Sequence, residues 1–115
     1  MIRFLGPEVD LDGLVADAVE EGREVRVVHA GPTKELTLEA FAEALDFPGW
    51  FGHNLDALSD CLEYLARTAT GEWEIVVDDI AELGRADWVA MAGIRGVLGE
   101  LVLKYPTINV TYIER

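Results

Sequence analysis

The sequence has little cysteine and lacks the common nucleotide-binding motifs. Its 115 residues include a single cysteine, Cys61, so the chain cannot form a disulfide within itself. With no second thiol and no spaced set of histidines and carboxylates, a metal site has no support either. Neither of the glycine-rich patterns that cradle phosphates, G-x-x-x-x-G-K-S/T and G-x-G-x-x-G, occurs. We therefore expect neither a metal nor a cofactor.

Long hydrophobic runs and a targeting segment are also missing. No apolar run approaches the roughly eighteen residues that mark a membrane-spanning helix. The chain does not open on a basic stretch followed by an apolar one, as a secretory signal does. We expect a soluble, cytoplasmic protein that does not bind membranes.

Basic residues are scarce. The chain has 9 Lys and Arg against 22 Asp and Glu, which gives a net charge of −13. A surface this acidic repels the phosphates of nucleic acids and of anionic lipids, so direct binding to either is not expected. The same charge suits a cationic partner, and it also suits plain solubility. The charge alone leaves both interpretations open.

Hydrophobic residues, by contrast, make up 50% of the chain, which is enough to bury a core and excludes a disordered chain. A length of 115 residues fits one domain, residues 1–115. Short β-branched segments predict strands at 25–29, 73–77 and 107–113, with a weaker one at 2–5. Apolar residues at helical spacing predict helices at 11–21, 38–45, 55–67 and 87–104, the second with Thr37 as its N-cap.

This alternation of strands and helices indicates an α/β fold. Parallel neighbouring strands need crossover connections, and helices supply them. We expect a small three-layer domain with a three-stranded parallel sheet over residues 25–113. Residues 1–24 are then an N-terminal extension that adds a further strand and helix.

Residues 47–65 read F-P-G-W-F-G-H-N-L-D-A-L-S-D-C-L-E-Y-L. On a helical wheel, one side carries four leucines with Cys61 at its edge: Leu55, Leu58, Leu62 and Leu65. The opposite side carries Asp56, Asp60, Glu63 and Arg67. The wheel predicts a leucine face toward the core and an acidic stripe toward solvent, with Asn54 as the N-cap.

Two interpretations of the acidic stripe are open. It is either an ordinary solvated face or a carboxylate pair held on a rigid helix for a cationic partner. Asp56 and Asp60 are like charges four residues apart, an arrangement that destabilises an isolated helix. Trp50 and Phe51 precede the N-cap, and one of two adjacent aromatics usually enters the core. The other is then exposed beside the carboxylates, which suits a surface that meets Arg, Lys and His.

The pattern F-P-x-aromatic-aromatic-G-x-N-L-D-A-L-x-D-C-L over residues 47–62 resembles the signature of the barstar family, intracellular inhibitors of bacterial ribonucleases such as barnase. The resemblance implies that the signature helix and the loop before it plug a ribonuclease active site. Asp60 stands at the position whose carboxylate replaces the substrate phosphate, and Asp56 at the neighbouring acidic contact. Trp50 matches the aromatic that packs on the catalytic histidine, and Phe51 the adjacent ring.

Gly52 and Asn54 match loop and cap positions near the contact. The sequence also departs from the family pattern. Ser59 stands where the family usually has an aromatic, and Glu100 is the nearest candidate for a glutamate contact near the end of the last helix. The resemblance implies a protein inhibitor of a basic bacterial ribonuclease that does no chemistry and is a monomer when free. Glu63 is included in the expected contact surface because it lies on the acidic stripe.

Two other functional classes stay open as alternatives. One is an immunity or antitoxin module that neutralises a different basic toxin or nuclease. The other is an enzyme that uses His53, Asp56 and Cys61, although Cys61 is expected to be a small core residue.

Three further features are interpreted from sequence. Asp78-Asp79 ends a strand and is expected to serve the loop that follows, with a carboxylate site for a metal or a base as the alternative. Trp73 and Trp88 are expected to lie in the core or at its edge. Gly93, Gly96 and Gly99 recur at every third position of the last helix, where glycine costs about 1 kcal/mol relative to alanine. Close packing and the approach of a partner are both open as explanations of these glycines.

Overall fold

A computed structural model describes all 115 residues as a parallel four-stranded sheet with five helices. The strands are β1 (Ile2–Leu5), β2 (Glu24–His29), β3 (Trp73–Asp78) and β4 (Ile108–Ile113), in the spatial order β1-β4-β3-β2. The helices are α1 (Leu11–Glu20), α2 (Lys34–Ala44), α3 (Leu55–Thr68), α4 (Ile80–Ala86) and α5 (Trp88–Lys104). The predicted α/β fold with a parallel sheet is confirmed, and the N-terminal strand completes the same sheet.

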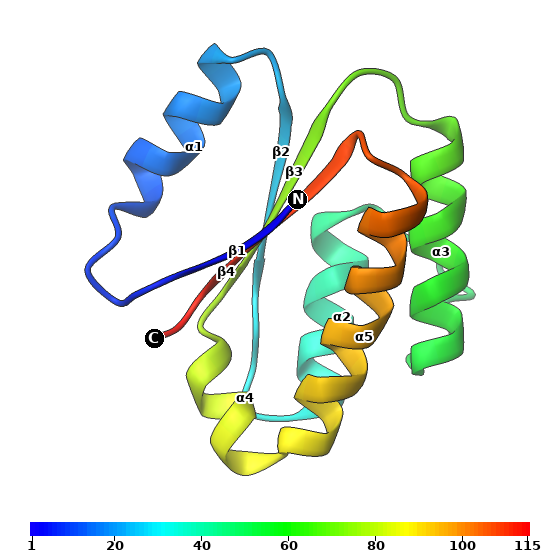
Figure 1. Ribbon diagram of the computed structural model, residues 1–115. Coiled ribbons are helices and arrows are strands. Elements are labelled where there is room, and N and C mark those ends of the chain that lie inside the picture. The colour runs from blue at the N-terminus through cyan, green and yellow to red at the C-terminus, as the bar shows by residue number, and fades with distance from the viewer.

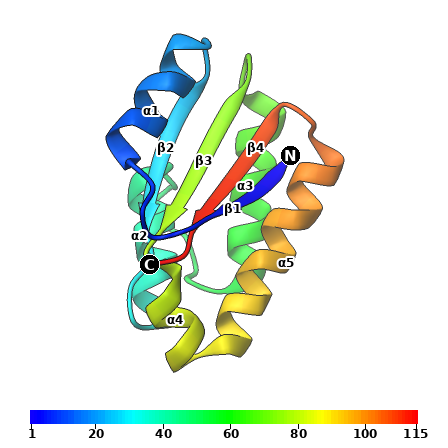
Figure 2. The same ribbon diagram turned by 60° about the vertical axis from the view of Figure 1, so that its left-hand side comes forward.

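The helices cover the two faces of the sheet unequally. Figure 1 shows α1 on one face and α2, α3 and α5 on the other, with β1 and β2 at the two edges. Turning the molecule brings the four parallel strands into view, with α4 below them between β3 and α5 (Figure 2). The arrangement follows from the parallel strands, because each connection must cross a face of the sheet to begin the next strand.

The core lies between the sheet and the layer of α2, α3 and α5. Strand pairing places Ile75 beside Val110 and Val77 beside Tyr112, so these residues share one face. All four are at most 1% exposed. Strands β3 and β4 are buried on both faces, because helices cover both sides of the sheet.

The opposite face of the sheet, toward α1, carries a buried polar cluster. Glu74 is fully buried, and its Oε1 accepts a hydrogen bond from Thr111 Oγ1 at 2.9 Å. Arg3 Nε donates to Thr111 Oγ1 at 2.9 Å, and Arg3 Nη2 lies 3.4 Å from the same Glu74 oxygen. The N-terminal strand is therefore joined to the centre of the sheet by a charged side chain as well as by the strand ladder.

Two helix predictions need correction. The second helix starts four residues earlier than predicted, because Thr33 is its N-cap and accepts from Leu36 N at 3.1 Å. Thr37 instead lies buried inside the helix, where its hydroxyl donates to the carbonyl oxygen of Thr33 at 2.8 Å. Helix α4 was not predicted at all. It is seven residues long and contains a glycine, so its periodic signal is weak.

Two single-residue predictions are also wrong. Trp88 is 71% exposed and does not belong to the core, whereas Trp73 is half-buried as expected. Asp78 ends its strand as predicted, but its carboxylate does not serve the loop: Asp78 is the last residue of β3 and is 1% exposed. Arg115 Nε and Nη2 each donate to one Asp78 oxygen at 2.9 Å. Burial alone would raise the pKa of Asp78, but the hydrogen bonds from Arg115 and from Asp79 N, with the charge of Arg115, lower it below its usual range.

Replacing Asp78 by Asn should lower the free energy of unfolding at neutral pH by about 2 kcal/mol, since hydrogen bonds to charged groups contribute about 1.5–3 kcal/mol. Because the pKa of Asp78 is lowered by folding, its contribution is present above its unfolded pKa, about 3.9, and is lost as the pH falls through the folded value. Urea unfolding of both proteins should therefore show a difference in their free energies of unfolding that becomes smaller below about pH 4.

The matched control is Asp60→Asn, which removes the charge of an exposed carboxylate that has no ion pair in the chain. Its free energy of unfolding should stay within about 0.5 kcal/mol of the wild type. If Asp78→Asn lowers the free energy of unfolding by the same amount at acid and neutral pH, the charge of the Asp78 carboxylate does not stabilise the fold.

Candidate functional site

Helix α3 presents its acidic residues because its opposite face is fixed in the core. Leu58 and Leu62 are fully buried, and Cys61 at the edge of this face is 6% exposed. Asn54 caps the helix as predicted, with its Oδ1 accepting from Ala57 N at 2.8 Å. The rotation of the helix is therefore fixed, and Asp56 and Asp60 point to solvent.

The loop before α3 separates its two adjacent aromatics, as predicted. Phe51 is 5% exposed, with its ring 5.1 Å from that of Phe47 and 4.9 Å from that of His53. Trp50 is 78% exposed. His53 adopts a φ of 50°, in the left-handed region, where the chain bends into the helix. The buried Phe51 anchors the loop, and the loop presents Trp50 beside the helix.

A groove of about 560 Å³ runs between this loop and α3. Trp50 lies on the loop side, Asp60 and the 63% exposed ring of Tyr64 lie on the helix side, and Cys61 also lines the groove. Neither Asp56 nor Asp60 forms an ion pair or a side-chain hydrogen bond within the chain. The groove thus combines apolar walls with a carboxylate that has no cationic partner. Tyr64 was not predicted as a site residue, because an exposed aromatic on the acidic side of a helix has no pattern to mark it.

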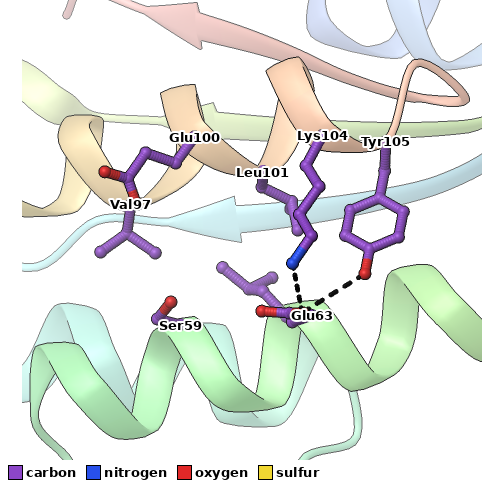
Figure 3. Close-up of a pocket in the computed structure, with 8 residues that line it drawn as sticks. Ser59, Glu63, Val97, Glu100, Leu101, Lys104 and Tyr105 are labelled. Atoms are coloured by element: carbon purple, nitrogen blue, oxygen red, sulfur yellow. Dashed lines mark hydrogen bonds and ion pairs between the residues drawn. The ribbon is translucent and has the colours of Figure 1, made fainter.

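Glu63 is paired within the chain, unlike Asp56 and Asp60 on the same predicted acidic stripe. Its side chain is 36% exposed, and its Oε1 accepts from Lys104 Nζ at 2.7 Å and from the Tyr105 hydroxyl at 3.4 Å. Figure 3 shows these groups converging across the space between α3 and α5. The hydrogen bond and the charge of Lys104 hold the pKa of Glu63 below its usual range. One carboxylate of the predicted acidic stripe, that of Glu63, is therefore already paired within the chain, and its place in the contact surface stays a prediction.

The remaining predicted site residues lie near the groove between the loop and α3, or near the contact between Glu63 and Lys104. Ser59 and Glu100 line the small cleft of about 120 Å³ that also contains Glu63 and Lys104. Gly52 is exposed, and a Cβ added there would meet the Asn54 amide nitrogen at 3.2 Å. The structure therefore brings Trp50 and Asp60 together on one groove, while Ser59, Glu63 and Glu100 belong to the neighbouring α3–α5 cleft.

The alternative of a thiol enzyme finds no support in the environment of Cys61. Burial raises the pKa of the Cys61 thiol, and the neighbouring charge of Asp60 raises it further. A catalytic cysteine needs the opposite shift, toward the thiolate.

One group could in principle hold a metal: the side chains of His29, Asp78 and Asp79, whose ligand atoms lie within 4.8 Å of one another. The sequence contains the signal for this cluster, because His29 and Asp78 end adjacent parallel strands and are register partners. Both oxygens of Asp78, however, already accept hydrogen bonds from Arg115.

None of the helices is long and apolar enough to cross a membrane. A comparison with curated protein sequences found no match. Two solved structures of Drosophila ORC, one bound to DNA and one bound to AT-rich DNA and Cdc6, contain chains of similar fold, with TM-scores of 0.58 and 0.52. Both are 18% identical over 99% of this chain, which spans 66% and 40% of their respective lengths. At this identity the likeness concerns the fold alone.

The comparison with family models has a different outcome. The model described as "Barstar (barnase inhibitor)" matches residues 21–110, which include β2, β3, the groove and all of α3. Strand β1 and all of α1 lie outside the match. Because the match covers most of the sequence and includes the signature segment, this chain belongs to the barstar family.

Proposed function

We propose that the protein inhibits a basic bacterial ribonuclease by covering its active site with α3 and the loop before it. The observation that carries the proposal is the pair of unneutralised carboxylates, Asp56 and Asp60, of which Asp60 shares a groove with the exposed Trp50. The same residues lie within the part of the chain that matches the barstar family. The protein acts as a rigid plug and does no chemistry.

The physical basis is competition with an anionic substrate. A ribonuclease cleft is lined with Arg, Lys and His because RNA carries phosphates. Carboxylates held on a rigid helix form charge-assisted hydrogen bonds with those groups, and Trp50 adds a ring that stacks on a cationic or imidazole side chain. The net charge of −13 attracts a basic enzyme from a distance and speeds encounter.

A second candidate is a different basic toxin or nuclease bound through the same surface. It is favoured by the internal pairing of Glu63 with Lys104 and by the serine at position 59. Ser59, Glu63 and Lys104 all line the cleft between α3 and α5, so both features affect what a target would contact there. The two candidates share Asp60 and differ in the target, so a panel of basic ribonucleases that includes barnase distinguishes them.

Asp60→Ala should raise the Kd for the inhibited ribonuclease at least about 30-fold, because truncation of a central contact costs about 2 kcal/mol or more. The measurement is a titration of ribonuclease activity with wild-type and variant protein. The matched control is Glu20→Ala, which removes the same charge from an exposed, unpaired position at the end of α1. Equal losses in the two variants would mean that only net charge matters, and would contradict a contact at Asp60.

The two adjacent aromatics should separate binding from stability. Trp50→Ala should leave the free energy of unfolding within about 0.5 kcal/mol, as exposed substitutions do, and weaken inhibition by about tenfold or more. Phe51→Ala should lower the free energy of unfolding by about 3 kcal/mol, because a buried ring is lost from the core. Urea unfolding and the activity titration measure the two effects. Unchanged inhibition by Trp50→Ala would remove this ring from the interface.

Association with the ribonuclease should be strongly salt-dependent. Its rate constant should fall several-fold as the ionic strength rises from about 0.01 M to 0.15 M, because the Debye length falls from about 30 Å to about 8 Å. Stopped-flow mixing at several salt concentrations measures this. A rate that does not change with salt would contradict electrostatic attraction between the two proteins.

A further inference from the structure

The outer face of α5 is apolar and uncovered. Ile94 and Leu98 on its inner side are fully buried, as expected for a helix that packs on a sheet. Its outer side is also apolar, yet Val89 is 63% exposed and Leu103 is 85% exposed. A helix that is apolar on all sides is normally buried on all sides. Exposed apolar side chains near both ends of one helix face, on a protein with a net charge of −13, suit an interaction surface.

The outward residues of α5 follow a heptad. Positions 89, 92, 96, 99 and 103 are separated by three, four, three and four residues, the a and d spacing of a coiled coil. They are Val89, Ala92, Gly96, Gly99 and Leu103, and we call them the α5 seam. The seam points away from the core, because four of its residues are exposed and Gly99 is half-buried.

The glycines of the seam have no role within the chain. A Cβ added at Gly96 or Gly99 would meet no atom within 4 Å, although glycine is a poor helix former. Gly93 differs, because a Cβ there would lie 2.6 Å from Leu55 Cδ1 on α3. Close packing inside the molecule explains Gly93 alone. The close approach of a second backbone from outside explains the other two.

Two residues of opposite charge, Arg95 and Glu100, flank the seam, so each can pair with the other in a second copy. With Gly96 at an a position, Arg95 takes a g position and Glu100 an e position. In a parallel pair of helices, the g residue of one helix lies next to the e residue five positions later in the other, and opposite charges there favour pairing. Neither Arg95 nor Glu100 has an ion pair within the chain. Two copies of the seam therefore offer two complementary charge pairs.

A cavity beside Arg95 is lined by no acidic residue. It has a volume of about 400 Å³ and is lined by α5 and the edge strand β1. Within it the Arg95 guanidinium lies 4.7 Å from the centre of the Phe4 ring. Tyr112, which is 1% exposed, also lines the cavity, and its hydroxyl has no hydrogen-bond partner. An arriving carboxylate would find the unpaired Arg95 guanidinium here.

We propose that α5 pairs in parallel with α5 of a second copy of this chain, around a two-fold axis along the seam. The glycines allow close approach, Val89 and Leu103 pack at the two ends, and Glu100 of each copy pairs with Arg95 of the other. Such an interface is self-complementary, as a two-fold axis requires. The charge of −13 on each copy opposes pairing, so the dimer forms at high protein concentration and is strengthened by salt. This salt response is opposite to that of the ribonuclease complex.

The test is sedimentation equilibrium of the full chain over a range of protein and salt concentrations. The mean mass should rise from 12.7 kDa toward twice that value as protein concentration increases, and should rise further with salt. Arg95→Glu and Glu100→Arg should each raise the dissociation constant about tenfold, since attractive pairs become repulsive. The double variant with both changes should regain wild-type association. Because Glu100→Arg makes the chain less acidic, weakening by this variant cannot come from net charge.

A second variant tests the seam without touching charge. Gly96→Gln places a side chain in open space within the monomer, so the fold is kept, but it blocks close approach and should abolish the dimer. A mass of 12.7 kDa at every concentration would overturn the proposal. A dimer that survives Gly96→Gln, or that the double charge swap fails to restore, would also overturn it. Ribonuclease inhibition should be unchanged by Gly96→Gln, because this change keeps the charge and Asp60 and Trp50 lie outside the seam.

Discussion

The packing of the leucine face of α3 is the constraint on which the candidate site depends. Leu58 and Leu62 are fully buried against the sheet and its helices, and Leu55 packs into the space left by Gly93 on α5. A helix fixed in this way cannot rotate its acidic side inward. Asp56 and Asp60 are therefore held at the surface without neutralising partners. Two of the chain's negative charges are thus fixed at one place on a rigid helix.

Much of this arrangement could be predicted from sequence because it depends on local rules. The 3.6-residue periodicity of the leucines placed α3, and the Asn54 cap placed its start to the residue. The adjacent aromatics were predicted to separate, and Phe51 enters the core while Trp50 remains outside. The strands were predicted from β-branched runs, and their parallel pairing from the helices between them.

What the sequence did not reveal depends on contacts between distant residues. Glu63 and Lys104 are 41 positions apart, so no local pattern shows that this carboxylate is neutralised. The burial of Asp78 and its pairing with Arg115 could not be predicted, because the two residues are 37 positions apart. The start of α2 was misplaced because two threonines four residues apart are equally good caps by composition. Only the fold decides that Thr37 is buried and Thr33 is not.

The central claim is that the acidic face of α3 occupies the place of RNA in a ribonuclease active site. Calorimetric titration of barnase with this protein, in the absence and presence of guanosine monophosphate, tests it most directly. The account predicts binding whose apparent Kd rises in proportion to the nucleotide concentration once the active site is filled, since both ligands need the same cationic groups. No binding to barnase or to any other ribonuclease of the panel, or binding that the nucleotide leaves unchanged, would contradict it.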